Sequence, residues 1–320
     1  MSDPSLPEPS AGADQDATLP SWAYVVALIA LIALVVAVLV QVAATVRQNR
    51  SPPATTMATR AASEPDAATY KAWGQAAFER GEYAQAAADF GDATRLDPGD
   101  AQAYYHRARA YFVLGEYQLT LQSLNQAIRL QPDYAEAYYY RGATLAALGA
   151  YEQAVAEFSL ALALIPEFPR AYHQRGKAYF ILSEYERAIA DYDRAVQLDP
   201  ELAEGFYDRG LARFALENYA LAEADLEQAI ALAPDWPEAH YWRGNARFRQ
   251  QKFDQALQDY HTAIDLNPEH APSYHARGLT YRQLGDKESA RADFERVLTL
   301  TLDPQLLAGA KLQIQELEKE

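Results

Sequence analysis

The sequence predicts an all-α protein in which one transmembrane helix precedes a long α-solenoid. Two observations predict it. Residues 22–46 form a run of 25 residues without a charged side chain. From residue 67 onward, proline, small and aromatic residues recur every 34 residues, which is typical of stacked helix-turn-helix units.

Composition narrows the classes of function. The chain of 320 residues carries a formal net charge of -16, whereas nucleic-acid-binding proteins normally present a basic face. We therefore expect no nucleic-acid partner. The chain contains no cysteine, which excludes disulfides, cysteine-ligated zinc, iron–sulfur clusters and thiol nucleophiles.

The first element is a polar segment. Residues 1–20 are rich in Ser, Pro, Ala and Asp and include no Lys or Arg. Too little apolar surface is present to drive folding, so we expect a disordered acidic tail.

Residues 21–46 are expected to form a transmembrane helix. As a helix, residues 22–46 would extend roughly 37 Å, enough to cross a hydrocarbon core of about 30 Å. Trp22 and Tyr24 lie at one end, as interfacial aromatic residues do. A buried soluble helix of this length would carry a polar face. A cleaved signal peptide would have a basic start and a shorter apolar core.

The flanking charges indicate an orientation. Arg47, Arg50 and Arg60 follow the apolar run, and no basic residue precedes it. The positive-inside rule then puts the N-terminal tail outside and the rest of the chain in the cytoplasm. Residues 47–66 are rich in Pro, Ala, Thr and Ser, and we expect them to be a flexible linker.

The solenoid is predicted from five columns of residues that share the 34-residue period. The proline column ends each second helix, small residues let the two helices of a unit approach closely, and the aromatic columns fill the space between neighbouring units. The prolines are Pro98, Pro132, Pro166, Pro200, Pro234 and Pro268; the small residues of the first helix are Gly74, Ala108, Gly142, Gly176, Gly210, Gly244 and Gly278; those of the second helix are Ala86, Thr120, Ala154, Ala188, Ala222, Ala256 and Ala290. The larger residues of the first helix are Tyr70, Tyr104, Tyr138, Tyr172, Phe206, His240 and Tyr274; those of the second helix are Phe90, Leu124, Phe158, Tyr192, Leu226, Tyr260 and Phe294.

These columns resemble the tetratricopeptide repeat, most clearly in the stretch from Ala135 to Pro166. The resemblance implies a right-handed α-solenoid of seven repeats over residues 67–304. Two arginines, Arg213 and Arg247, depart from the pattern by standing where a large apolar residue is usual. The expected repeats are 67–100, 101–134, 135–168, 169–202, 203–236, 237–270 and 271–304.

The C-terminal residues 305–320 are expected to form a capping helix. Asp303 and Pro304 suit its start, and Leu306, Ala310, Ile314 and Leu317 form one apolar stripe. Such a helix would cover the open end of the solenoid.

No constellation for chemistry interrupts the repeats. The sequence contains no phosphate-binding glycine loop, no HExxH motif and no nucleophile elbow. We therefore predict no enzyme, no catalytic residues, no cofactor and no metal site.

An arginine column recurs immediately before the small residue of the first helix. It supports two interpretations: a ladder of cations for an acidic partner, or structural bonds to carboxylates or helix-end carbonyls of a neighbouring repeat. Strict recurrence favours the structural interpretation. The column holds Arg107, Arg141, Arg175, Arg209, Arg243 and Arg277.

In the resembled family, first-helix residues line a concave groove that binds peptides. Carried onto this sequence, three rows give an aromatic groove with scattered cations. We expect the tyrosine row to be exposed; the phenylalanine row either faces the groove or packs under the adjacent helix. The predicted partner-binding residues are Lys71, Tyr105, Arg109, Phe112, Tyr139, His173, Lys177, Phe180, Tyr207, Phe214, Tyr241, Asn245, Phe248 and His275.

The function predicted from these features is that of a membrane-tethered scaffold. Residues 22–46 would anchor the chain, and the groove would capture a protein or peptide partner. The alternative is a self-associating, homo-oligomeric component of a membrane assembly.

Overall fold

The structure, a computed structural model, describes residues 65–319. The predicted tail (1–20), the predicted transmembrane helix (21–46) and the linker up to residue 64 lie outside the described residues. In the described part, no helix is both long and apolar enough to cross a membrane.

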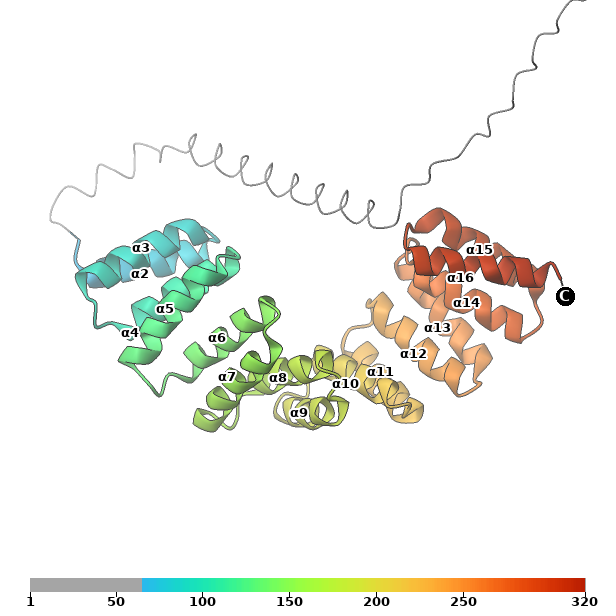
Figure 1. Ribbon diagram of the computed structural model, residues 1–320, viewed down its shortest axis with the longest axis horizontal. Helices are drawn as coiled ribbons and strands as arrows, with labels where there is room; N and C mark the ends of the chain where they lie inside the picture. The colour runs from blue at the N-terminus through green and yellow to red at the C-terminus, as the bar shows by residue number, and fades with distance from the viewer. Residues whose placement is uncertain (1–64, 320) are drawn as a thin grey trace, which may run out of the picture. The chain divides into compact units, whose positions relative to one another are not determined.

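Residues 65–319 contain fifteen helices and no strand. Fourteen of them form hairpins of a first helix and a second helix, and the last follows alone (Figure 1). The hairpins are α2 (Ala67–Glu79) with α3 (Tyr83–Leu96), α4 (Ala101–Val113) with α5 (Tyr117–Leu130), α6 (Ala135–Ala147) with α7 (Tyr151–Leu164), α8 (Pro169–Ile181) with α9 (Tyr185–Leu198), α10 (Ala203–Ala215) with α11 (Tyr219–Leu232), α12 (Pro237–Arg249) with α13 (Phe253–Leu266), and α14 (Ala271–Gln283) with α15 (Lys287–Leu300); α16 (Pro304–Leu317) is the last helix.

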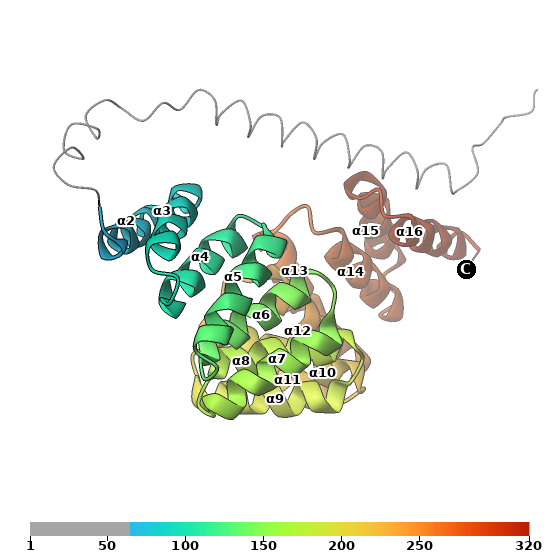
Figure 2. The same cartoon turned by 60° about the vertical axis from the view of Figure 1, so that its left-hand side comes forward.

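The hairpins follow one another in chain order along a curved stack (Figures 1 and 2). Each first helix contacts the first helix of the next hairpin. No two second helices contact each other within the described solenoid. The first helices therefore lie on the inner side of the curve, and the second helices spread apart on the outer side.

The core confirms the columns predicted from the sequence. The small residues of the second helices are fully buried, and the large residues of the same helices, such as Phe90, Tyr192 and Tyr260, are at most 1% exposed. At Gly176 an added Cβ would lie 2.7 Å from the Tyr192 ring, so the absence of a side chain is what lets this ring pack against the first helix.

The turn between the two helices of a hairpin needs a left-handed residue. Glycine supplies it in four hairpins, for example at Gly149 with φ +80°. Ser183, Glu217 and Gln251 adopt φ of 61–62° at the corresponding positions of three other hairpins. Because a Cβ disfavours this region, these three turns store backbone strain.

The arginine column has a structural role, as the recurrence indicated. Arg175 donates from Nε and Nη2 to the Asp191 carboxylate at 2.8 and 2.7 Å, and from Nη1 to Ser159 at 2.9 Å. The carboxylate lies on the second helix of the same hairpin, and the third contact lies on the second helix of the preceding one. The sequence-based expectation is that these arginines bind carboxylates of a neighbouring repeat. The main carboxylate instead lies in the same hairpin, and a contact with a carboxylate of the preceding hairpin, such as that of Arg209 with Asp193, is secondary.

The two arginines that depart from the repeat pattern join these ion pairs. Arg213 reaches the Asp225 carboxylate at 2.8 Å, beside Arg209. Arg247 reaches Asp259 at 2.9 Å, beside Arg243. Each departure places a second guanidinium on a carboxylate that is nearly inaccessible to solvent.

Helix α16 covers the last hairpin. The Asp303 side chain accepts hydrogen bonds from the backbone N–H groups of Gln305 and Leu306 and thereby starts the helix. Ala310 is fully buried in one cluster with Phe294 and Val297 of α15. This helix supplies the apolar contacts that a following hairpin would otherwise provide.

Candidate partner-binding surface

The predicted groove residues lie on the first helices, on the inner side of the stack. Their exposure differs from the sequence-based expectation. Tyr105 and His173 are buried, at 8% exposure each. Lys177 alone is exposed, and the other predicted residues are partly buried.

The expected exposure of the tyrosine row is wrong because each ring is covered by a side chain that precedes the next first helix. Tyr207 stacks on Trp236 with ring centroids 4.3 Å apart. Tyr139 lies 5.0 Å from the Phe168 ring. These rings join neighbouring hairpins, and burial raises the pKa of both Tyr139 and Tyr207. Tyr105 packs on Tyr134, and Tyr241 packs on His270, in the same way.

The remaining members of this row make polar contacts or none. His173 Nε2 lies 2.7 Å from an Asp208 carboxylate oxygen on the next first helix. Lys71 donates to Asp100 at 2.7 Å. His275 Nε2 is buried without a hydrogen-bond partner among the described residues. Asn245 belongs to the neighbouring row, together with Arg109 and Lys177, and accepts a hydrogen bond from the Tyr260 hydroxyl of the core at 2.8 Å.

The phenylalanine row packs against the aromatic residue that begins the second helix of its own hairpin. Phe112, Phe180, Phe214 and Phe248 lie 5.2–6.0 Å from Tyr117, Tyr185, Tyr219 and Phe253, respectively. The phenylalanine rings therefore pack against the adjacent helix and are also partly accessible from the groove, so each of the two interpretations holds in part.

Arg109 is the most unusual member of the set. Its guanidinium lies over three rings, at 4.7 Å from Phe78, 5.7 Å from Tyr105 and 5.8 Å from Tyr140. Its Nε is buried without a hydrogen-bond partner, and it forms no ion pair within the described residues. Burial, followed by the positive charge of Arg109, lowers the pKa of the nearby His106 to about 4. Arg109 is therefore a positive charge that is surrounded by neutral aromatic rings.

Two exposed apolar residues at the ends of first helices were not predicted from the sequence. Val113 is 49% exposed and Ile181 is 52% exposed. Each lies one helical turn after a cation, Val113 after Arg109 and Ile181 after Lys177. Small residues, Ala143 and Ala147, hold the same positions on the helix between them. The sequence does mark these two residues, because they are the large apolar members of a repeat column whose other members are polar or small.

Comparison with known proteins identifies the repeats. Sequence models of the tetratricopeptide repeat match residues 71–132, 123–156, 144–182, 176–243, 237–270 and 271–304. The matches run without a gap from residue 71 to residue 304. The solenoid is therefore built of tetratricopeptide repeats, a class of protein-interaction scaffold. No curated protein matches the chain.

Solved structures show the same fold. The chain is similar to YrrB, described as a TPR protein with an unusual peptide-binding site, with a TM-score of 0.53 and 24% identity over 60% of this chain and 99% of that one. It is similar to a TPR repeat-containing protein of Cytophaga hutchinsonii, with a TM-score of 0.60 and 18% identity over 74% and 98% of the two chains. It also resembles pilF of Pseudomonas aeruginosa, with a TM-score of 0.58 and 19% identity over 68% and 96%.

Proposed function

We propose that the chain is a membrane-tethered scaffold whose inner surface binds a protein or peptide segment that carries both acidic and apolar side chains. One observation carries the proposal: a cation that forms no ion pair with a described residue (Arg109 or Lys177) and an exposed apolar residue recur together on α4 and on α8. An exposed apolar residue next to an unpaired charge is a contact surface that a partner can bury and neutralise. The peptide-binding site described for YrrB supports the class of ligand.

The proposed contact residues are fewer than those predicted from the sequence, because the tyrosine row packs between hairpins. Tyr139, Tyr207 and Tyr241 join hairpins, so replacing them by alanine should weaken the fold as well as the binding. Lys177, Val113 and Ile181 are exposed and can be replaced with less damage to the core, whereas Arg109 also covers the rings of Phe78 and Tyr140. These four residues are the ones to test.

Site-specific photocrosslinking in cells tests the surface. A photoreactive amino acid at Val113 or Ile181 should form adducts with a partner, and Arg109→Ala combined with Lys177→Ala should remove them. Leu221 on α11 is the matched control position, because it is 53% exposed and lies on a second helix. Equal adducts at Leu221, or adducts that persist in the double variant, would refute the assignment. Lys311→Ala, which removes an exposed cation on α16, serves as the control for charge.

The membrane anchor and its orientation are part of this proposal and rest on the sequence. A single cysteine at Glu320 would be the only thiol in the chain. Labelling by an impermeant maleimide only after lysis supports a cytoplasmic solenoid, and labelling of intact cells reverses the orientation. Recovery of the chain in the soluble fraction would refute the anchor.

Self-association stays the alternative predicted from the sequence. Light scattering over a range of protein concentrations separates the two functions. A mass that stays monomeric at every concentration argues against a self-assembling component and leaves capture of a different protein.

A further inference from the structure

The arginine column contains one member without a carboxylate. In four hairpins the guanidinium binds an aspartate sixteen residues later, and Arg141 binds Glu157 at the same spacing. Ser123 holds this position opposite Arg107. Arg107 is consequently the one member of the column that forms no ion pair in the described solenoid.

The neutral contacts of Arg107 replace only part of the missing interaction. Nε donates to Ser123 Oγ and Nη1 donates to Thr94 Oγ1, both at 3.1 Å. The two hydroxyls donate onward to the carbonyls of Leu119 and Gly91, so they accept from Arg107 as neutral groups. Nη2, which binds the aspartate in the other hairpins, has no hydrogen bond to any described residue. The Tyr104 ring supports the guanidinium from one side, 5.0 Å from its centroid.

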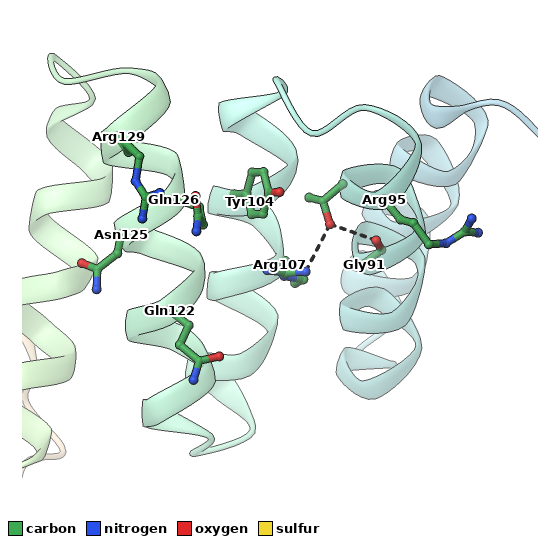
Figure 3. A pocket seen from close by; sticks show the side chains of 9 residues that line it. Gly91, Arg95, Tyr104, Arg107, Gln122, Asn125, Gln126 and Arg129 are labelled. Atoms are coloured by element: carbon green, nitrogen blue, oxygen red, sulfur yellow. Dashed lines mark hydrogen bonds between the residues drawn. The ribbon is translucent and has the colours of Figure 1, made fainter.

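Arg107 lies in a cavity of about 590 Å³ that is largely open to solvent, on the outer side of the stack. Helices α3 and α5 form its walls and α4 forms its base, because successive second helices spread apart (Figure 3). The volume lies within the range of ligand sites in proteins, about 300–1,000 Å³. The lining residues are Gly91, Thr94, Arg95, Tyr104, Arg107, Gln122, Asn125, Gln126 and Arg129.

The lining is basic although the whole chain is strongly acidic. It contains three arginines and no carboxylate. Arg95 is paired with Asp92 at 3.1 Å, whereas Arg129, like Arg107, forms no ion pair with a described residue. The amide side chains of Gln122 and Gln126 add donors and acceptors of the kind that hold a peptide backbone, whereas Asn125 Oδ1 already accepts a hydrogen bond from Arg141 Nη1 at 2.9 Å.

We propose that this cavity binds an acidic segment of another protein, and that a Glu or Asp carboxylate of that segment takes the place that an aspartate of the chain occupies in the other hairpins. The planar guanidinium fork fits a carboxylate through two parallel bonds. None of the predicted groove residues lines the cavity, so this site is separate from the inner surface and does not depend on the function proposed for it.

Isothermal titration calorimetry on the full-length protein tests the site. The probe is a short blocked peptide of alternating Gly and Glu, compared with its Gly and Gln analogue. We expect saturable binding of the Glu peptide and binding at least about tenfold weaker for the Gln analogue, the loss that follows from one charge-assisted hydrogen bond. Equal affinity for both peptides, or no binding of the Glu peptide, would overturn the proposal.

A matched pair of variants locates the binding. Ser123→Asp gives Arg107 the internal carboxylate of the other hairpins and should abolish binding. Ser123→Asn has nearly the same shape without the charge and should keep the affinity within about threefold of the wild type. Unchanged binding in Ser123→Asp would place the peptide elsewhere.

Two further measurements make the outcome specific. If Ser123→Asp proves unfolded by circular dichroism, Arg107→Gln provides a second loss-of-charge variant with the same expected loss of binding. Inorganic phosphate is titrated in parallel, and tighter binding of phosphate than of the Glu peptide would assign the cavity to phosphate groups instead. The Arg109→Ala and Lys177→Ala double variant should bind the Glu peptide normally, so failure of the inner-surface proposal is distinguishable from failure of this one.

Discussion

Gly176→Ala is a direct test of how the hairpins pack. The new Cβ would lie 2.7, 2.8 and 3.2 Å from three carbons of the Tyr192 ring. Carbon atoms pack at about 3.5–4.0 Å, so the ring would have to retreat by roughly 0.8 Å. Tyr192 is 1% exposed and clusters with Tyr179, Ala188 and Ala212, which leaves it little room to move.

Two opposing terms set the expected magnitude. Overpacking a well-filled core costs about 1–3 kcal/mol. Alanine in a helix interior is favoured over glycine by about 1 kcal/mol. Because the ring is enclosed, we expect the upper part of the cost and a net loss of about 1–2 kcal/mol in the free energy of unfolding.

A double-mutant cycle isolates the clash. Ala108 and Leu124 form the equivalent pair in the second hairpin, and both are fully buried. In a Tyr192→Leu background, Gly176→Ala should therefore cease to destabilise the protein. Gly91→Ala is the control for helix propensity, because no atom lies within 4 Å of its new Cβ. That variant should gain about 0.5–1 kcal/mol.

Unfolding in guanidinium chloride, followed by far-UV circular dichroism, measures these differences. The unfolding midpoints of two variants are compared only where the dependence of the free energy on denaturant concentration is the same. A changed slope would show that some repeats unfold separately from the others. The reasoning is refuted if Gly176→Ala is as stable as the wild type, or if Tyr192→Leu leaves its effect unchanged.

Three further predictions concern charge, strain and pH. Asp259→Asn should destabilise the protein by about 3 kcal/mol or more, and by more than Asp191→Asn, because Asp259 is bound by both Arg243 and Arg247; equal melting temperatures would contradict this. Glu217→Gly should raise the free energy of unfolding by about 1 kcal/mol by relieving a φ of 61°, as measured by the same denaturation. His106 should make stability pH-dependent: its pKa is lowered from 6.5 to about 4, so the unfolded chain binds the proton first, and the stabilisation present above pH 6.5 is lost as the pH falls towards 4. His106→Gln should flatten the stability-versus-pH curve in that window, and an unchanged curve would exclude His106 as its source.

The fold could be predicted because the period repeats the same contacts seven times over. A proline, a small residue and an aromatic residue in fixed order define where a helix ends, where two helices approach and what fills the space between them. Tyr192 and Tyr260 are buried as their column predicts. Residues 1–64 have no such internal repetition, and their predicted anchor depends on the length and hydropathy of one apolar run and on the aromatic residues at its start.

The candidate surface was less predictable, because exposure depends on residues of the next hairpin. The row containing Tyr105 and Tyr207 does lie on first helices. What covers these rings is the column of Tyr134, Phe168, Trp236 and His270, whose members differ in chemistry and so give a weak signal. The carboxylates opposite the arginine column were detectable, since Asp191, Asp225, Asp259 and Asp293 also recur every 34 residues.

The gap in the arginine column links stability to ligand binding. A partly buried guanidinium without a carboxylate is a less favourable arrangement than the ion pairs of the other hairpins, because its charge is partly desolvated and is compensated only by neutral groups. Ser123→Asp should therefore raise the free energy of unfolding, whereas Ser123→Asn should not. An acidic peptide that binds the folded but not the unfolded protein should raise the melting temperature of the wild type through its contact with Arg107. The same peptide should leave the melting temperature of Ser123→Asp unchanged. If Ser123→Asp lowers stability instead, the stability argument fails, and the peptide site is then decided by the binding of the Glu peptide to Arg107→Gln.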